Sequence, residues 1–190
     1  MSHEEQVILV SPDDRAVGVA GKLEAHRRGL RHRAFSVILF NGEGEMLIQK
    51  RAAEKYHSAG QWANACCSHP RPGEAVDVAV VRRLRWELGI DCPVMPLQTV
   101  SYCARVSSEL VENEIAHLFV GRHDGTLRPN PEEVAEARWI DPDRLMREVA
   151  AAPERFTVWF RIYLERCAPS FAAAARKLSV SSHRAPVAPQ

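Results

Sequence analysis

The sequence has no apolar run that approaches the roughly 20 residues that a membrane-spanning helix needs. Its first six residues are polar and acidic, and they lack the basic-then-apolar layout of a secretory signal peptide. The five cysteines are an odd number without a disulfide framework, which is typical of a reduced cytoplasmic protein. We therefore expect a cytoplasmic protein with free thiols and no membrane association.

The sequence also lacks an excess of charge of either sign. Lys and Arg total 25 against 24 for Asp and Glu, a net charge of +1, which gives no global reason to expect nucleic acid as a partner. The 190 residues are 46% hydrophobic, enough to bury one core. We expect a monomer with a single domain over residues 1–178. Residues 179–190, rich in Ser, Pro and Ala, are expected to form a disordered tail.

Strand and helix signals alternate without a regular strand–helix–strand rhythm. Strands are predicted at residues 7–10, 33–40, 46–49, 94–106, 115–120 and 137–140. A helix is predicted over 74–88, because apolar residues recur there every four positions and Gly89 follows. A second helix should begin at Asp141-Pro142, with Asp141 as N-cap, and a terminal helix should cover 156–178. The fold class is therefore α+β, with a mixed sheet flanked by helices.

One cluster of reactive side chains lies in the segment from Trp62 to Pro70. Cys67 and His69 are two residues apart and precede a Pro-Gly turn, so both should lie at a strand end, where scaffolds often present reactive groups. A buried thiol beside a surface histidine explains the local pattern about as well.

Histidines and carboxylates elsewhere could complete a metal site. His26 and His32 precede a predicted strand, and Glu112 and Glu114 precede another. Two carboxylates at i and i+2 of an extended segment point the same way. Together with His69 they suit a divalent transition metal. Each residue taken singly is more often an ordinary surface group.

The predicted helix carries a degenerate sequence motif. The spacing of Ser68, Glu74, Arg82, Glu87 and Gly89 resembles the Nudix box, Gly-x5-Glu-x7-Arg-Glu-apolar-x-Glu-Glu-x-Gly-apolar. Three positions differ from it: Ser68 replaces the first Gly, Arg83 replaces a Glu, and Trp86 replaces the first of the paired acids. Nudix hydrolases use these acids to hold Mg²⁺ against a diphosphate, so the resemblance implies a Nudix fold with different chemistry.

A second resemblance supplies that chemistry. From about Val7 to Trp159 the chain resembles the type I isopentenyl-diphosphate isomerases. The matching segments are Ala34-Phe35-Ser36, Lys50-Arg51-Ala52, Trp62 with Asn64, Cys67-Ser68-His69-Pro70 and Glu112-Asn113-Glu114. Two features depart from the family: Ser68 stands where it commonly has Gly, and the spacing from His26 to His32 is one residue shorter.

The resemblance implies a role for each matching residue. Catalytic roles fall to Cys67, Glu114, Tyr102 and Trp159, the last lying against the hydrocarbon end of the substrate. The implied ligands of one divalent metal, Mn²⁺ or Zn²⁺, are His26, His32, His69, Glu112 and Glu114. Glu87 would help to hold Mg²⁺ bound with the diphosphate. The basic residues that would grip the diphosphate are Lys22, Arg51, Lys55 and Arg83. Cys66 and His117 match no role, and we expect them to be structural.

These residue types suit the implied reaction, because the double bond of isopentenyl diphosphate is a very poor base. A carboxylic acid bound to a metal becomes a stronger acid, which suits Glu114 as the proton donor to C4. The ring of Trp159 could stabilise the resulting cation by on the order of 1–2 kcal/mol. Cys67 as a thiolate could remove a proton from C2. Trp159 is equally well explained as a core aromatic, and the four basic residues as surface charges.

Two other functions fit parts of the pattern. A Nudix hydrolase would act on a nucleoside or prenyl diphosphate, although the residues at 83 and 86 argue against it. A regulatory module with a structural zinc would use the His, Cys and Glu side chains without catalysis. Structural zinc sites often use paired cysteines at short spacing, whereas Cys66 and Cys67 are adjacent and poorly placed to share one ion.

Overall fold

The computed structural model describes residues 5–180, which form one mixed sheet with helices on both faces. The strands are β1 (Gln6–Val10), β2 (Ala16–Gly21), β3 (His32–Phe40), β4 (Met46–Arg51), β5 (Trp62–Asn64), β6 (Cys66–Ser68), β7 (Val94–Arg105), β8 (Val111–Arg122) and β9 (Val134–Ile140). The helices are α1 (Lys22–Arg28), α2 (Val76–Leu88), α3 (Pro142–Ala151), the 3₁₀ turn η1 (Pro153–Arg155) and α4 (Val158–Val180).

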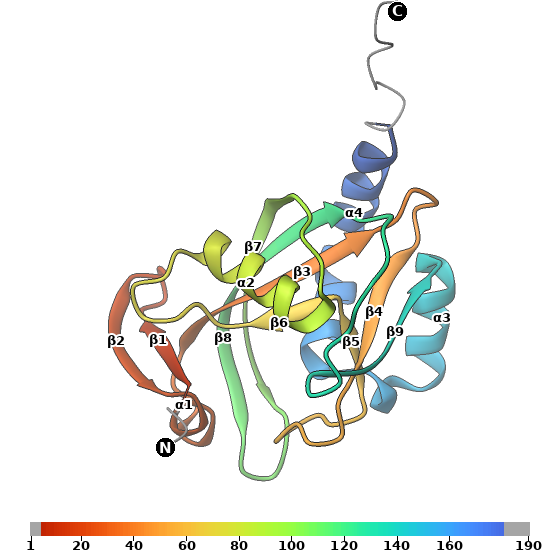
Figure 1. The fold of residues 1–190 in the computed structure, drawn as a ribbon. Coiled ribbons are helices and arrows are strands. Elements are labelled where there is room, and N and C mark those ends of the chain that lie inside the picture. Colours follow the sequence, from red (N-terminus) through yellow and green to blue (C-terminus); the bar gives the residue numbers. More distant parts are fainter. Residues whose placement is uncertain (1–4, 181–190) are drawn as a thin grey trace, which may run out of the picture.

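Strand β3 is the centre of the sheet (Figure 1). It runs parallel to β8 along its whole length and antiparallel to β6, while β1 pairs with its first residue. Strand β3 pairs with β4 at one position, where Phe40 lies opposite Met46. Beyond that pair the two strands diverge, because β4 continues between β5 and β9. The divergence leaves room between them for side chains of both strands.

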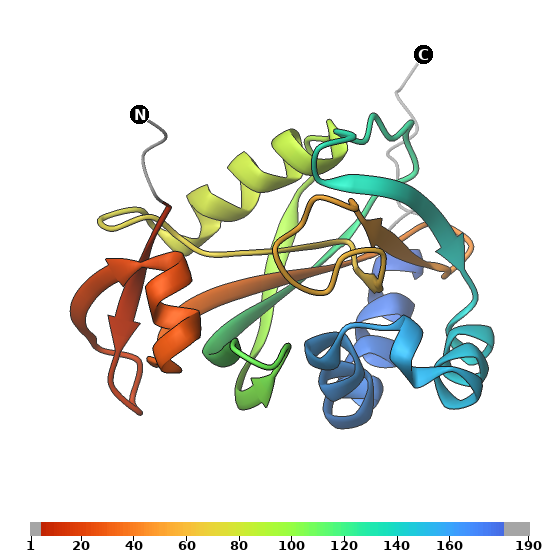
Figure 2. The ribbon, with the colours of Figure 1, turned by 90° about the horizontal axis from the view of Figure 1, so that it is seen from below.

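Side chains of β3 alternate between two cores, one on each face of the sheet. Val37 and Leu39 pack with apolar residues of α2, whereas Ile38 and Phe40 pack with aromatic residues of α4. Figure 2 shows α2 on one side of the sheet and α3 and α4 on the other. This burial on both faces explains why the strand reads as a nearly continuous apolar run.

The caps of α2 and α3 follow the expected chemistry. Helix α2 begins two residues later than predicted and ends at Gly89, whose φ of 64° suits glycine. A Cβ at this position would lie 2.7 Å from Cβ of Arg128, so the close approach also requires glycine. The prediction for Asp141 is confirmed, since its side chain accepts a hydrogen bond from the backbone N–H of Arg144 at 2.8 Å.

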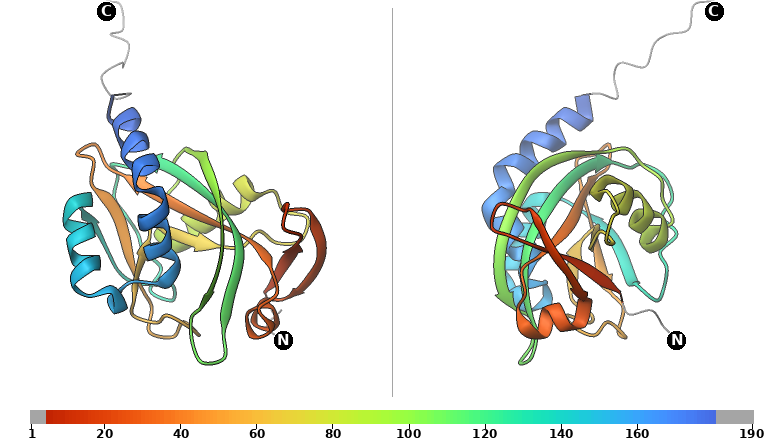
Figure 3. Two further views of the ribbon diagram at one scale, coloured as in Figure 1. Left: turned by 180° about the vertical axis from the view of Figure 1, so that it is seen from behind. Right: turned by 90° about the vertical axis from the view of Figure 1, so that its left-hand side faces the viewer.

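Other boundaries differ from the prediction. Strand β8 begins at Val111, so Glu112 and Glu114 lie inside the strand rather than before it. Helix α4 begins at Val158 and continues to Val180, and its last turns extend past the sheet (Figure 3). Ser179 and Val180 are therefore helical, and the remainder of the expected tail, residues 181–190, lies outside the described residues. Within residues 5–180, no helix combines the length and apolar character needed to cross a membrane.

Candidate active site

A cleft lies where β3 and β4 diverge, and it gathers nearly all of the predicted site residues. The predicted residues that line it are Lys22, Arg51, Lys55, Cys67, His69, Arg83, Glu87, Tyr102, Glu112, Glu114 and Trp159. They come from α1, α2, α4, the strands β4, β6, β7 and β8, and the loops that follow β4 and β6. His26 and His32 do not line the cleft but are fully buried behind it, in ring contact with His69.

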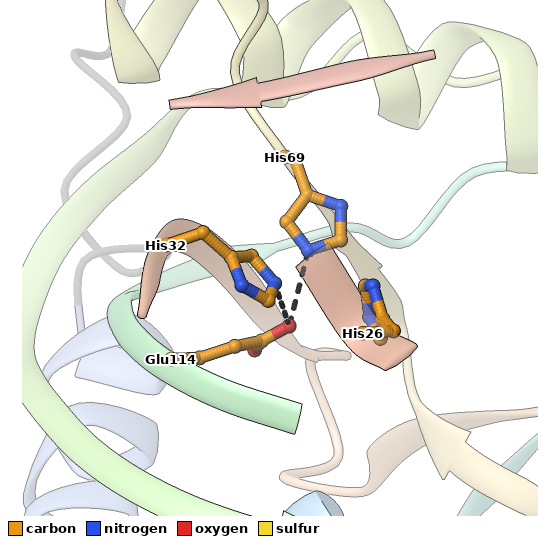
Figure 4. Close-up of side chains that lie close together, drawn as sticks. All are labelled: His26, His32, His69 and Glu114. Carbon is orange, nitrogen blue, oxygen red and sulfur yellow. Dashed lines mark hydrogen bonds and ion pairs between the residues drawn. The ribbon is translucent and has the colours of Figure 1, made fainter. Parts of the chain in front are cut away.

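Three histidines and one carboxylate converge beside the cleft (Figure 4). His26 comes from α1, His32 from the start of β3, His69 from the residue after β6 and Glu114 from β8. The parallel register pairs His32 with Glu114. The Nε2 atoms of His32 and His69 lie 3.3 and 3.0 Å from Oε1 of Glu114. One ligand atom from each of the four residues lies within 4.8 Å of the others, so the cluster could hold a divalent metal ion.

The hydrogen bonds of two histidines show which nitrogen is free. Nδ1 of His26 lies 2.7 Å from the carbonyl oxygen of Lys22, and Nδ1 of His32 lies 2.8 Å from that of Leu30. A carbonyl only accepts, so Nδ1 carries the proton and Nε2 keeps its lone pair. Nε2 of His26 is buried without a hydrogen-bond partner among the described residues. This arrangement, with one ring nitrogen held by a carbonyl, is typical of metal-ligating histidines.

Tyr102 connects the two carboxylates of β8. Its hydroxyl lies 2.6 Å from Oε2 of Glu114 and 3.0 Å from Oε2 of Glu112. Burial, with the Glu114 carboxylate beside it, raises the pKa of Glu112 well above its usual range. Burial also acts to raise the pKa of Glu114, but its interactions with the neighbouring rings of His32 and His69 outweigh burial and hold that pKa low. A protonated Glu112 can therefore donate to the Tyr102 oxygen while Tyr102 donates to Glu114.

The thiol of Cys67 lies on the other side of β3, because β6 and β8 flank that strand on opposite sides. Its Sγ accepts hydrogen bonds from the Ser36 hydroxyl and the Trp159 indole N–H, both at 3.2 Å, and donates to Oδ1 of Asn64 at 3.0 Å. Burial raises the pKa of Cys67 to about 12, and the donors Ser36 and Trp159 act against that rise. The group is thus held as a thiol, with two donors in place to stabilise a thiolate.

Trp159 is a core residue that also reaches the cleft. The side chain is only 2% exposed and belongs to the core on the α4 side of the sheet. It also lines the cleft, where the guanidinium of Arg51 lies 5.2 Å from the centre of its ring. The indole can therefore face a substrate without leaving the core.

The basic residues of the cleft are paired, mostly with carboxylates. Lys22 lies 2.7 Å from Glu5, and Lys55 lies 2.6 Å from Glu133. Arg83 lies 2.8 Å from Glu87 and 3.1 Å from Glu133. Arg51 instead donates to the carbonyl oxygen of His57 at 3.2 Å. A diphosphate that bound Lys22, Lys55 or Arg83 would compete with these carboxylates.

The degenerate Nudix box occupies α2 and the turn before it. Glu74 forms an ion pair with Arg82 at 2.7 Å and does not line the cleft. Glu87 points into the cleft and accepts hydrogen bonds from Arg83, Gln49 and the thiol of Cys66. Trp86 is half exposed, and its indole N–H donates to Glu133 at 3.1 Å. Among the box positions, Glu87 alone therefore brings a carboxylate to the cleft within the described residues.

Sequence reasoning missed several side chains of the cleft. Ser36 lies in the matching segment Ala34-Phe35-Ser36, but its hydrogen bond to Cys67 could not be inferred from that segment alone. Gln49 and Glu133 carried no signal, because their importance depends on contacts with Glu87 and Lys55. His57 lies in the loop between β4 and β5, where no periodic pattern marks a buried residue.

Comparison with known proteins identifies the family of the chain. The NUDIX domain family model matches residues 30–160. The Isopentenyl-diphosphate Delta-isomerase of Burkholderia multivorans is 49% identical over 163 residues, which are 86% of this chain and 93% of the relative. A protein of the same name from Cereibacter sphaeroides strain ATCC 17025 is 55% identical over 146 residues, or 75% of this chain and 82% of the relative.

Solved structures resemble the fold at low sequence identity. A Deinococcus radiodurans protein of known crystal structure has a TM-score of 0.72 at 21% identity, covering 86% of this chain and 99% of that protein. A MutT protein from Methanosarcina mazei has a TM-score of 0.59 at 19% identity, covering 77% and 94%. These two matches concern the fold alone.

Proposed function

The chain belongs to the Nudix family and, within it, to the isopentenyl-diphosphate Delta-isomerases, and from this premise we propose how its cleft performs the reaction. The protein is an enzyme of isoprenoid biosynthesis that interconverts isopentenyl diphosphate and dimethylallyl diphosphate. The roles of the individual side chains, the metals and the order of proton transfers form the proposal.

One observation carries the assignment of roles. Cys67 and Glu114 line the same cleft but come from strands on opposite sides of β3. A 1,3-allylic rearrangement needs a proton donor at C4 and a proton acceptor at C2. A carboxyl group and a thiol on either side of one substrate could serve as the proton donor and the proton acceptor, respectively.

Glu114 is the proposed donor to C4. A donor must be protonated, and the chain from Glu112 through Tyr102 to Glu114 is a route by which it could receive a proton. Cys67 is the proposed acceptor at C2 as a thiolate, which hydrogen bonds from Ser36 and Trp159 would stabilise. Trp159 also presents its ring to the cleft, where it can stabilise positive charge on the substrate.

The proposed ligands of a first divalent ion, Mn²⁺ or Zn²⁺, are His26, His32, His69, Glu112 and Glu114. Nε2 of His26 is buried without a hydrogen-bond partner among the described residues, and Nε2 of His32 lies 3.3 Å from Oε1 of Glu114. A cation between these atoms would bind all three lone pairs. Such an ion would make a bound carboxyl group more acidic and would offset the repulsion between the two carboxylates. Glu87 is the proposed protein group for Mg²⁺ held with the diphosphate.

The diphosphate would be held by four basic residues that line the cleft, Lys22, Arg51, Lys55 and Arg83. Charge-assisted contacts of this kind fix the substrate without taking part in bond changes. The hydrolase alternative has less support, because Arg83 forms an ion pair with Glu87 and Trp86 is directed to Glu133. A purely structural zinc site would leave the contacts of Cys67 unexplained.

Product analysis tests the function directly. Incubated with isopentenyl diphosphate and Mg²⁺ in D₂O, the protein should form dimethylallyl diphosphate with solvent deuterium in the new methyl group, as read by proton NMR. Phosphorus NMR of the same sample should show intact diphosphate. Release of phosphate or pyrophosphate as fast as isomerisation would favour the hydrolase alternative.

Metal removal tests the cofactor proposal. Exhaustive treatment with EDTA should abolish turnover, because the buried donor set at Glu114 would lose its cation and the diphosphate would lose Mg²⁺. Adding Mg²⁺ with Mn²⁺ or Zn²⁺ should restore turnover, measured by product formation. Full activity after chelation, in protein that metal analysis shows to be free of bound ions, would contradict the metal proposal.

A further inference from the structure

His57 is a buried histidine that the proposed reaction does not use. It lies in the loop of residues 52–61, between β4 and β5, and lines the cleft. Its ring lies 5.7 Å from that of His26 and contacts Trp159 edge-on at 5.8 Å. One donor atom each from His26, His57 and Glu112 lies within 4.8 Å of the others, forming a second group that could hold a metal ion.

This second group and the cluster at Glu114 meet at His26. Nδ1 of His26 is engaged by the carbonyl of Lys22, so only Nε2 is free to bind an ion. One nitrogen lone pair binds one ion, and two separate ions therefore cannot both use His26. Together the two groups hold six donors, the number that an octahedral transition metal takes. His57 and Glu112 lie within 4.8 Å of His26 but do not form one group with the whole cluster at Glu114, so a single ion would have to draw the two groups together. The donors are His26, His32, His57, His69, Glu112 and Glu114.

The contacts of His57 agree with a ligand better than with a purely structural residue. Its Nε2 lies 3.6 Å from Oε1 of Glu112, which is too long for a hydrogen bond. Neighbouring donors on one ion lie about 3 Å apart when metal–donor bonds are about 2.1 Å. Nδ1 of His57 lies 3.2 Å from the hydroxyl of Ser58, so the ring is held on the side away from Glu112.

The same loop carries groups proposed to hold the diphosphate. Lys55 is two residues before His57, and Arg51 donates to the His57 carbonyl oxygen. An ion bound to the His57 ring would hold this loop in place. It would thereby also restrict the side chains of Lys55 and Arg51. Binding at one site would then favour binding at the other, since such coupling is reciprocal.

We propose that His57 is a sixth protein ligand of the divalent ion and that the ion orders the loop of residues 52–61. This inference rests on the proposed metal site and extends it to His57, to which the resemblance assigned no role. It assigns His57 a binding role toward the ion and no proton transfer.

Metal binding by His57→Phe is the test, because phenylalanine keeps an aromatic ring against Trp159 and removes both nitrogens. The matched control is His123→Phe, which removes a histidine just beyond the far end of β8. Apoprotein is titrated with Co²⁺ alone by calorimetry and by visible absorption. Hydrogen exchange of residues 52–61 is measured with and without Co²⁺. His57→Leu replaces the first variant if circular dichroism shows that the phenylalanine protein does not fold.

Wild type and the control should bind one Co²⁺ per chain, and the ion should slow exchange in the loop. His57→Phe should bind Co²⁺ at least ~10-fold more weakly, with stronger visible absorption as coordination falls below six and no slowing of exchange. Wild-type affinity and spectrum in this variant would overturn the inference while leaving the proposed function intact. Two ions per wild-type chain would overturn it as well. Failure of the wild type to bind Co²⁺ would instead contradict the metal site itself.

Discussion

Cys67→Ala should lose isomerisation by at least ~10³-fold, since general base catalysis contributes about 10²–10⁴ and the described neighbours offer no replacement. Ser36 and Trp159 are hydrogen-bond donors to Sγ, and the Asn64 amide is a very weak base. A loss of 10³ corresponds to about 4 kcal/mol of transition-state stabilisation. Turnover measured by NMR, with product deuteration in D₂O, checks the result.

The variant should remain folded and should still bind metal, because Cys67 belongs to neither potential metal-binding group. Cys103→Ala is the matched control: it removes the same atoms from an exposed position on β7 and should retain full activity. A folded, metal-loaded Cys67→Ala protein with nearly wild-type turnover would show that Cys67 is not the base. Cys66, which is buried and donates to Glu87, would then be the next candidate.

Glu114→Gln should have two effects, because Glu114 is proposed as both proton donor and metal ligand. The amide cannot deliver a proton, so isomerisation should fall by at least ~10³-fold. The substitution also removes the negative charge at Oε1, which lies within 3.3 Å of Nε2 of both His32 and His69. Metal affinity, measured by Co²⁺ titration, should therefore fall at least ~10²-fold.

Glu109→Gln is the control for this variant. It makes the same chemical change at an exposed residue between β7 and β8 and should alter neither property. Comparing the two losses separates the roles of Glu114. A variant that loses metal affinity but regains full turnover when saturated with metal would contradict the donor role. A variant that stays inactive with wild-type metal affinity would contradict the ligand role.

Parts of the fold with a long or strongly marked pattern could be predicted from the sequence. Helix α2 was found from its four-residue apolar spacing and Gly89, and α3 from the cap at Asp141. Helix α1 was missed because it has only seven residues and Gly21 provides no side-chain cap. Strand β2 was missed because Val17 and Val19 are exposed, so no buried face alternates along it.

The candidate site depended on resemblance more than on local pattern. Cys67, His69, Glu112 and Glu114 were singled out by spacing, but their meeting depends on β6 and β8 both pairing with β3. No local pattern specifies that long-range pairing. His57, Ser36 and Glu133 escaped notice for the same reason, because each acts through neighbours that are distant in sequence.

The pairing of the cleft's cations with carboxylates has a consequence for which anions can enter. An incoming phosphate group does not meet unpaired positive charge at Lys22, Lys55 or Arg83, because Glu5, Glu87 and Glu133 already neutralise these side chains. A phosphate group that binds one of these side chains displaces its carboxylate partner. The displaced carboxylate then needs another positive charge nearby. A diphosphate that arrives with its own Mg²⁺ brings that charge, whereas inorganic phosphate or chloride without one does not. On the proposed function, these ion pairs would make Lys22, Lys55 and Arg83 poorer partners for simple anions than for a metal-bound diphosphate.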